Sequence, residues 1–467
     1  MVAHQGGRPD VGAAAVREIK NMMNAFQMKA ICSLLIALAG IVGVPADDGV
    51  PGVTPPYYEV RYAPSTVEGE MKLGVTYTLW IPSDVRRLRG IIVHQHGCGE
   101  GACKGGATAA YDLHWQALAR KWDCALLGPS YHQAETNDCA WWCDPRQGSE
   151  KAYLRALTDF AAKTGHAELE RVPWALWGHS GGANWVGTML MLHPQRVAAV
   201  WLRSGSPRLF SKATNGVPSE MPEASLAVPV MCNIGVKERQ DRFAKLWEST
   251  FAFFQGLRAK GALVGFAPDP HTSHECGDSR YLAIPWFDAC LKQRLPKKPG
   301  APLRAMSKAG VWLAPMLGET AQPACTYVGE ASKSVWLPNK TVAKAWSEYV
   351  TTGGITDTTP PPAPKKVRVN TACELTWEAD ADFEGGLAGF IIERDGVELA
   401  RLPQKPAGPF GRPLFQKMSY HDTPEMPLPE MRYVDTTAPA GTKAKYRIRA
   451  VNSSGLQSPS SPATVIR

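Results

Sequence analysis

A serine between glycines stands where a predicted strand meets a predicted helix. Residues 178–182 read GHSGG, after the apolar run 172–177 and before the apolar run 183–193. Small residues two positions before and after Ser180 let strand and helix approach closely. The helix N-terminus also favours negative charge that develops beside it. This pattern indicates a nucleophile for acyl transfer, whereas the ordinary alternative for such a string is a structural turn.

A serine nucleophile requires a base and an acid, and in proteins built around this motif the chain order is serine, acid, histidine. Glu238 and Asp241 come after a later apolar run, and His271 and His274 come after the next one. A neutral imidazole accepts the serine proton while a carboxylate holds the other ring nitrogen. The residues alone leave both choices open, because exposed loop carboxylates and loop-lining histidines are common.

Backbone N–H groups for an oxyanion are predicted at Gly181 and Cys98. One donor of such a site follows the nucleophile, and the other lies in the loop after an earlier strand. The run 91–94 ends in a QHGCG tract that carries Cys98. His94 and His96 have the spacing of a metal-binding pair on one strand face, but the sequence offers no evident third ligand. We therefore predict neither a metal nor a cofactor.

Strand and helix patterns alternate around these residues, which predicts an α/β fold with a mostly parallel, doubly wound sheet. The expected strands and helices follow from apolar periodicity, caps and turn residues. Strands are predicted at 57–62, 75–81, 91–94, 124–127, 172–177, 197–202, 228–234 and 263–266, and helices at 107–121, 150–163, 183–193, 243–258 and 282–291.

The chain divides at two Pro-rich breaks into a large α/β region and a later all-strand region. We expect the catalytic α/β domain at 47–300, a connector at 301–357 and a Pro-rich linker at 358–363. Residues 364–467 read as an all-β sandwich, in which Asp-Gly between two alternating runs predicts a tight hairpin. An N-terminal extension and a signal peptide account for residues 1–46.

The signal peptide is predicted from a short apolar stretch that ends in Val44-Pro45-Ala46. The stretch is shorter than the roughly 20 residues of a membrane-spanning helix, so cleavage after Ala46 and a secreted or periplasmic protein are expected, with no span in the mature chain. All of the 11 cysteines except Cys32 follow Ala46. An oxidising compartment permits disulfides between them. The close spacings Cys98/Cys103 and Cys139/Cys143 are typical of loop staples, but spacing does not fix the connectivity, and buried thiols are the alternative.

Composition excludes several classes of protein. Charged residues make up 20% and hydrophobic residues 44% of the 467 residues, as in folded globular proteins. Lys and Arg number 51 against 43 Asp and Glu, and the formal charge is +8, but the basic residues are scattered. We therefore expect no nucleic-acid partner. The sequence leaves the oligomeric state open.

Three tracts carry a resemblance to a known family. Residues 96–98 read HGC, residues 139–142 read CAWW, and the elbow reads GHSGG. Together they resemble the polyhydroxybutyrate depolymerase and feruloyl esterase group of α/β-hydrolases, over residues 57 to 295. The resemblance implies the α/β-hydrolase fold and assigns Cys98 to the oxyanion loop. It also favours Glu238 over Asp241 as the acid and His274 over His271 as the base.

The last 100 or so residues resemble a fibronectin type III domain. Trp377 matches a core tryptophan, Tyr446 matches the tyrosine-corner position, and residues 452–458 match the loop before the last strand. A Pro-rich insertion at about 403–431 departs from the family pattern. We expect this module to act as a spacer, to stabilise the protein or to hold a polymeric substrate near the site. A chain ending near Gly354 is therefore predicted to keep the hydrolysis of small esters.

These features predict a secreted serine esterase that cleaves carboxylic esters through an acyl-enzyme, with polymeric or polysaccharide-linked esters among the substrates. A serine peptidase of the same fold would carry the same triad. A non-catalytic binding or adhesion protein on a hydrolase scaffold is the alternative of another class. Four tryptophans near the site in sequence would form either an apolar or sugar-stacking surface or ordinary core: Trp141, Trp142, Trp185 and Trp201.

Overall fold

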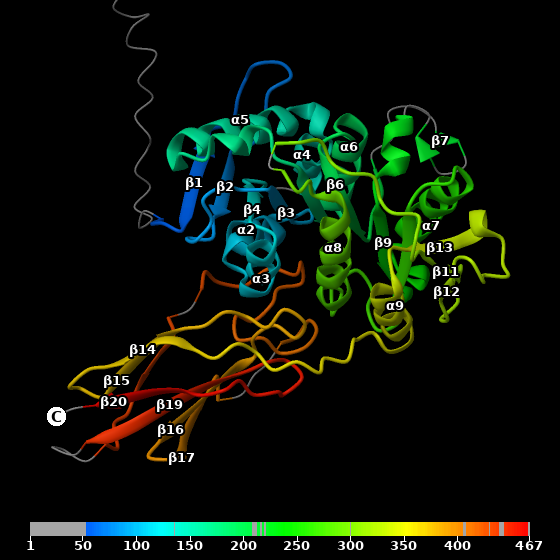
Figure 1. Ribbon diagram of the computed structural model, residues 1–467. Coiled ribbons are helices and arrows are strands. Elements are labelled where there is room, and N and C mark those ends of the chain that lie inside the picture. The colour runs from blue at the N-terminus through cyan, green and yellow to red at the C-terminus, as the bar shows by residue number, and fades with distance from the viewer. Residues whose placement is uncertain are drawn as a thin grey trace, which may run out of the picture. The chain divides into compact units, whose positions relative to one another are not determined.

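The apolar runs of the first 300 residues form one eight-stranded sheet in the order β1-β2-β4-β3-β5-β6-β9-β10 (Figure 1). Pairs from β4 to β10 are parallel, while β1 and β2 run antiparallel to their neighbours. The prediction of a mostly parallel α/β sheet is confirmed. The strands are β1 Tyr57–Tyr62, β2 Val75–Trp80, β3 Gly90–Gln95, β4 Cys124–Tyr131, β5 Trp174–His179, β6 Val197–Arg203, β9 Val230–Gly235 and β10 Val264–Asp269.

The computed structural model describes residues 53–134, 136–207, 213–214, 217–218, 221–298, 300–404, 408–428, 430–438 and 443–465. The predicted signal peptide and extension at 1–46 lie outside them. Among the described residues, no helix is both long and apolar enough to cross a membrane. Two short strands, β7 Ala213–Thr214 and β8 Val217–Pro218, pair with each other.

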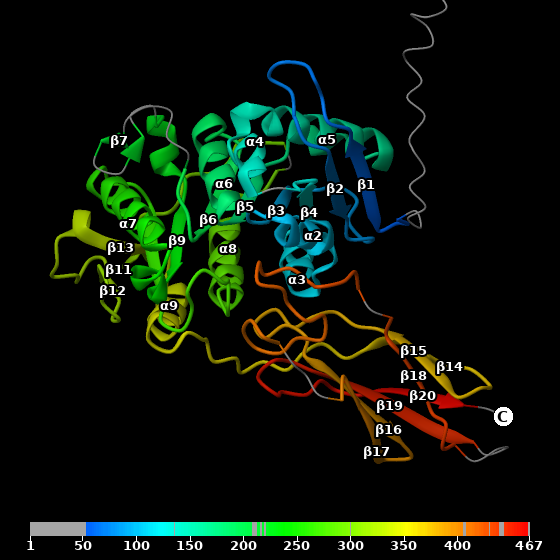
Figure 2. The same ribbon diagram turned by 180° about the vertical axis from the view of Figure 1, so that it is seen from behind.

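Helices cover both faces of the sheet, as Figures 1 and 2 show. The crossover from β3 to β4 runs opposite to the crossovers from β4 to β5 and from β5 to β6. Because such crossovers are right-handed, reversing their direction places the connecting helices on opposite faces. The helices are α2 Glu100–Thr108, α3 Leu113–Lys121, α4 Ala140–Cys143, α5 Ser149–Thr164, α6 Gly181–Leu192, α7 Ala244–Ala259, α8 Arg280–Arg294 and α9 Lys340–Thr352.

The helix predicted at 107–121 is continuous only from Leu113, as α3; the end of α2 and a 3-10 turn at Ala109–Tyr111 precede it. Asp112 precedes α3 with an extended backbone, and its side chain accepts hydrogen bonds from the backbone N–H groups of His114 and Trp115. A carboxylate in this position satisfies free N–H groups at a helix start, so it begins a new helix. Asp112 is also buried, which matters for the contacts of α8 described below.

The segment predicted as a connector, 301–357, carries regular structure that belongs to the α/β core. Strands β11 Trp312–Pro315, β12 Gln322–Pro323 and β13 Ser334–Leu337 form a small antiparallel sheet. Helix α9 follows, and its Trp346 and Tyr349 are fully buried in the main core. The Trp346 indole donates to the Phe266 carbonyl of β10 at 2.8 Å. These apolar faces pack on the main core, so the segment predicted as a connector also contributes structure to the α/β region.

The C-terminal region consists of two small antiparallel sheets around their own apolar core. Asp395 and Gly396 join two of the strands, and both have positive φ, as the predicted hairpin requires. The Tyr446 hydroxyl donates to the Asp435 carboxylate at 2.8 Å. The strands are β14 Lys365–Val369, β15 Glu374–Glu378 and β18 Arg432–Val434 in one sheet, and β17 Val397–Leu402, β16 Gly389–Arg394, β19 Ala444–Val451 and β20 Ser461–Val465 in the other.

The two regions share side chains. Leu113 of α3 lies in the apolar core of the C-terminal sheets. Residues 408–428, within the insertion noted in the sequence, form neither a helix nor a named strand and run against the α/β region. Residues 53–467 accordingly form one compact unit. The C-terminal sheets do have their own apolar core, but the expectation of an independent tail did not include the contacts that Leu113 and residues 408–428 make between the two regions.

Candidate active site

Ser180 occupies a tight turn between β5 and α6. Its φ of 55° and ψ of −117° lie in a backbone region that costs energy for residues with a side chain and that is found at active sites. A Cβ added at Gly178 would meet the Gly182 backbone, and one added at Gly182 would meet the backbone of Gln95 and His96. The requirement for small residues at both positions, predicted from the sequence, is confirmed.

Three side chains from separate loops meet at this turn. The Ser180 Oγ lies 2.9 Å from the His274 Nε2, within hydrogen-bonding distance. The His274 Nδ1 lies 3.5 Å from the Glu238 Oε1. That separation is longer than an ordinary hydrogen bond. Glu238 is 0% exposed, so its charge acts on His274 with little screening by water.

The competing acid and base lie elsewhere. Asp241 is exposed and accepts hydrogen bonds from the Ser273 hydroxyl and from the Phe243 backbone N–H. The His271 Nε2 lies 3.0 Å from the Thr352 carbonyl, at the end of α9. The residues alone left two candidate acids and two candidate bases. The fold brings Glu238 and His274 to Ser180.

Two residues that sequence reasoning missed support this arrangement. The Ser204 hydroxyl donates to the Glu238 Oε1 at 2.5 Å, which orients the carboxylate. The Phe243 ring stacks on the His274 imidazole, with centroids 3.9 Å apart and planes 11° from parallel. Ser204 follows β6 directly, at the carboxyl edge of the sheet where functional side chains gather, and that position was the available signal.

Arg203 holds the loop that carries His274. This arginine ends β6 and is fully buried. Its guanidinium donates to the Thr272 hydroxyl at 2.9 Å, to the Ser273 carbonyl at 3.2 Å and to the Glu275 carbonyl. It therefore binds the chain on both sides of His274. A charged residue at the end of an otherwise apolar strand was the sequence signal for this role.

The loop after β3 is fastened over the start of α6 by a disulfide. Cys98 bonds Cys139, with Cα atoms 5.6 Å apart, and Cys103 remains a buried thiol. Neither close pair, Cys98/Cys103 or Cys139/Cys143, forms a disulfide, because the fold brings the loop after β3 against the later Cys-Trp segment. A Cβ added at Gly181 would meet both disulfide sulfurs. The Cys98 side chain therefore lies against Gly181, the residue after Ser180.

His94 and His96, weighed as a metal pair in the sequence, are engaged separately. His94 stacks on Trp177 with centroids 3.9 Å apart, and its Nε2 lies 3.4 Å from the Asp422 carboxylate. The His96 Nδ1 lies 2.5 Å from the Gly97 carbonyl. Burial lowers the pKa of His96 to about 4, which keeps its ring neutral.

Within the described part of the chain, the carboxylates of Asp357, Asp382 and Glu384 come close enough together to share a metal ion. The Asn452 side-chain N–H group already donates to both Asp357 and Asp382, at 2.6 and 2.8 Å. Asp357 ends the segment before the C-terminal region, and Asp382 and Glu384 lie within that region. The side chains that donate to the cluster, Thr359 and Asn452, are not among the residues around Ser180.

The four tryptophans divide between core and surface. Trp142, Trp185 and Trp201 are fully buried, and the Trp142 indole donates to the Gln133 side chain at 2.8 Å. Trp141 is 44% exposed and lines a surface depression with Ala140. Only Trp141 of the four is therefore placed to contact a ligand.

The C-terminal region reaches the site as well. The Tyr420 carbonyl accepts a hydrogen bond from the Cys276 backbone N–H at 3.1 Å, two residues after His274. The His421 Nδ1 lies 2.9 Å from the Nδ1 of His179, the residue before Ser180. These contacts join positions more than 140 residues apart, so no local sequence pattern could have indicated them.

Comparisons with known proteins add only distant likenesses. No family model and no curated protein matches the chain. A thermostable esterase is 17% identical over 46% of this chain and 54% of its own, with a TM-score of 0.30. A ferulic acid esterase is 16% identical over 47% of this chain and 92% of its own, with a TM-score of 0.32. A siderophore hydrolase from Aspergillus nidulans is 13% identical over 55% of this chain and 100% of its own, also at 0.32. Likenesses at this level carry no argument about activity, so the functional proposal stands on the geometry.

Proposed function

We propose that this protein is a serine hydrolase of carboxylic esters with Ser180 as nucleophile, His274 as base and Glu238 as acid. The observation that carries the proposal is the Ser180 Oγ at 2.9 Å from the His274 Nε2, at a strained turn that starts a helix. An unused serine would gain nothing from a strained backbone conformation, which has to be maintained by the surrounding fold. Its alignment with a histidine and a buried carboxylate is the arrangement that nucleophilic catalysis requires.

In the acylation step, the Ser180 Oγ attacks the carbonyl carbon of the ester and its proton passes to the His274 Nε2. The carbonyl electrons move onto the oxygen, where the N–H groups of Gly181 and Cys98 stabilise the negative charge. The intermediate then expels the alcohol oxygen, which takes the proton from His274. In the second half-reaction, a water molecule attacks the acyl carbon while His274 takes its proton. The Ser180 oxygen then leaves with that proton, and the carboxylic acid product is released. Glu238 stabilises the imidazolium that forms in each half-reaction.

The finer assignments rest on sequence features. The HGC, CAWW and GHSGG tracts support the α/β-hydrolase fold and a place near the depolymerase and feruloyl esterase group. The stretch ending in Ala46 supports secretion. The antiparallel C-terminal sheets support a fibronectin type III-like module. Exposed Trp141, two positions after the Cys139 that fastens the proposed oxyanion loop, suits stacking on an aromatic or sugar ring of a polymeric ester.

A fluorophosphonate probe tests the proposal directly, because it forms a covalent bond only with an activated serine. We expect one adduct per chain by intact-protein mass, lost in Ser180→Ala and kept in Ser249→Ala, a matched control at an exposed helix position. Peptide mapping should place the adduct at Ser180. Labelling that persists in Ser180→Ala would refute the nucleophile.

A substrate panel then separates the alternatives. Nitrophenyl, acetyl, feruloyl and polyester substrates are compared with peptide substrates on the labelled and unlabelled protein. Hydrolysis of esters with no hydrolysis of peptides supports the esterase. Preference for peptides would indicate a peptidase, and absence of both labelling and hydrolysis would indicate a binding protein.

A further inference from the structure

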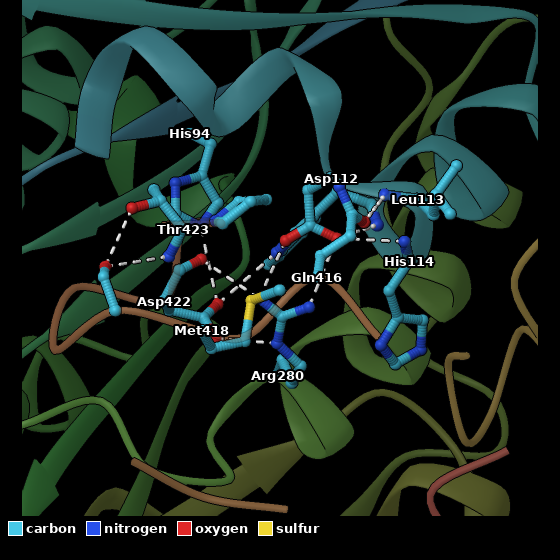
Figure 3. A network of polar contacts seen from close by, with 12 residues as sticks. His94, Asp112, Leu113, His114, Arg280, Gln416, Met418, Asp422 and Thr423 are labelled. Atoms are coloured by element: carbon cyan, nitrogen blue, oxygen red, sulfur yellow. Dashed lines mark hydrogen bonds and ion pairs between the residues drawn. The ribbon is translucent and has the colours of Figure 1, made fainter. Parts of the chain in front are cut away.

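The segment 408–428, called the strap from here on, is anchored in the α/β region by a buried ion-pair network (Figure 3). The Arg280 Nε donates to the Asp422 carboxylate at 2.7 Å, and the Arg280 Nη2 donates to the Asp112 carboxylate at 2.8 Å. All three side chains are at most 2% exposed. Asp422 belongs to the strap, Asp112 caps α3, and Arg280 begins α8. The strap is therefore fixed in position against the starts of α3 and α8.

Further polar contacts fix the strap on both sides of Asp422. The Gln416 side chain accepts from the Leu113 backbone N–H at 2.9 Å and donates to the Tyr111 carbonyl at 2.7 Å. The Thr108 hydroxyl donates to the Pro424 carbonyl. With anchors before and after it, His421 is held in place rather than carried on a free loop.

The hydrogen bonds of His179 determine the tautomers of two histidines. The His179 Nε2 lies 2.8 Å from the His274 carbonyl, which can only accept, so the Nε2 carries the proton. A neutral His179 then has a lone pair on Nδ1. The His421 Nδ1 lies 2.9 Å from it and must donate. The result is a directed chain from His421 through His179 to the backbone of His274.

Burial keeps both rings neutral, as this direction requires. Burial and the nearby His274 lower the pKa of His179 well below its usual value. Burial first, and the nearby His96 and His274 next, lower the pKa of His421 to about 3. Neither ring therefore carries a second proton at neutral pH that would reverse the chain.

The same pair of rings supports the oxyanion loop. A Cβ added at Gly97 would lie 3.1 Å from the Nδ1 of His179 and 3.1 Å from the Nδ1 of His421. Gly97 directly precedes Cys98, one of the proposed oxyanion donors. The two imidazoles thus touch both the segment with the base and the segment with the donor.

We propose that His421 is a positioning residue for the active site, supplied by the C-terminal region, which acts through the side chain of His179 on the backbone of His274 and on the oxyanion loop. This inference rests on the proposed function, because it concerns the same Ser180 and His274. The strap is accordingly part of the catalytic unit rather than an appendage to it. A hydrogen bond of this kind affects rate by about tenfold when it is lost.

The test compares two substitutions in the full-length protein. His421→Phe keeps a ring of similar size without the N–H donor, and His421→Asn places an amide N–H near the original Nδ1. We expect His421→Phe to lower kcat about tenfold with KM within about twofold, and His421→Asn to recover most of kcat. Glu425→Gln, an exposed position of the strap, serves as the matched control and should leave both constants unchanged. Kinetics are measured below each variant's unfolding transition.

Nitrogen-15 spectra of histidine-labelled protein give a readout independent of activity. We expect His179 protonated on Nε2 and His421 protonated on Nδ1, with signals assigned by their loss in the His421 variants and in His179→Gln. A His179 protonated on Nδ1 would overturn the inference, as would His421→Phe with unchanged kcat in an active protein. Absence of fluorophosphonate labelling and hydrolysis in the unsubstituted protein would instead refute the proposed function, whatever the tautomers.

Discussion

Asp422 and Arg280, 142 positions apart in the sequence, form an ion pair at 2.7 Å in which neither side chain is more than 2% exposed. Arg280 lies at the start of α8 and Asp422 in the strap. The attraction of Arg280 lowers the pKa of the Asp422 carboxyl, although its burial opposes this. The pair therefore couples the two regions of the chain electrostatically, and its loss would leave a buried charge without one of its partners.

Asp422→Ala should destabilise the whole unit by about 3–5 kcal/mol, because removing one member of a buried pair leaves the other charge without full compensation. Urea unfolding followed by circular dichroism measures the change. Glu398→Ala, which breaks an exposed pair with Arg401, is the control and should cost at most about 1 kcal/mol. Equal effects of the two substitutions would contradict a special role for the buried pair.

A chain ending at Gly354 should lose its folded state or the proposed hydrolysis of esters, in contrast to what the sequence predicts. Removing the later residues uncovers Leu113, takes Asp422 from Arg280 and removes the partner of the Cys276 backbone N–H. Soluble yield, thermal midpoint and nitrophenyl acetate hydrolysis are the measurements. A truncated protein with the thermal midpoint and kcat of the full-length protein would show that the C-terminal region is an independent module.

Among the triad candidates, His274→Ala and Glu238→Ala should lower kcat far more than His271→Ala and Asp241→Ala. We expect losses of roughly three orders of magnitude or more for the first pair, since a triad without its base or acid retains only binding and oxyanion stabilisation. The second pair should stay within about twofold, because these side chains do not face Ser180. Steady-state kinetics on a soluble ester measure kcat for the four variants. Larger losses for His271→Ala and Asp241→Ala would assign the base and the acid to those residues.

The Cys98–Cys139 disulfide should matter for both stability and rate. It spans 41 positions, for which loop-closure entropy predicts a contribution of about 4 kcal/mol. Cys139→Ala should lower the thermal midpoint and, because the oxyanion loop is no longer fastened over Gly181, also kcat. Cys325→Ala, at an exposed thiol, is the control. If the Cys139→Ala protein kept the original kcat at temperatures below its unfolding transition, other contacts would be sufficient to hold the loop that carries Cys98.

Stability should fall as the pH decreases from about 6.5 towards about 4, through the buried histidines. Burial lowers the pKa of His96 and His114 to about 4 and that of His421 to about 3. The unfolded chain, with histidine pKa values near 6.5, thus binds more protons than the folded one in this range. Each such proton contributes a slope of about 1.4 kcal/mol per pH unit.

Other groups also titrate in this range, so the comparison must isolate one histidine. Burial raises the pKa of Asp382 to about 7, which acts in the opposite direction: its contribution is lost as the pH rises through that value. His421→Asn removes one histidine and leaves Asp382 in place. Urea unfolding at several pH values should show a slope smaller by about one proton in the variant. Identical slopes would mean that the pKa of His421 is the same in the folded and the unfolded protein.

The local part of this protein was readable from the sequence. Apolar runs and turn residues act over a few positions, so the strand, turn and helix around Ser180 and the need for glycine at Gly178 and Gly182 followed from the residues themselves. The order of later candidates along the chain also narrowed the acid to Glu238 or Asp241.

What tertiary structure decided depends on packing between distant segments. Glu238 and Asp241 are three positions apart in one loop, and only the course of that loop turns the first towards His274. The partner of Cys98 depended on which segment lies across α6. His421 reaches His179 because an insertion in the C-terminal region crosses to the α/β region. No periodicity or spacing encodes such contacts, since they arise only when the whole core has formed.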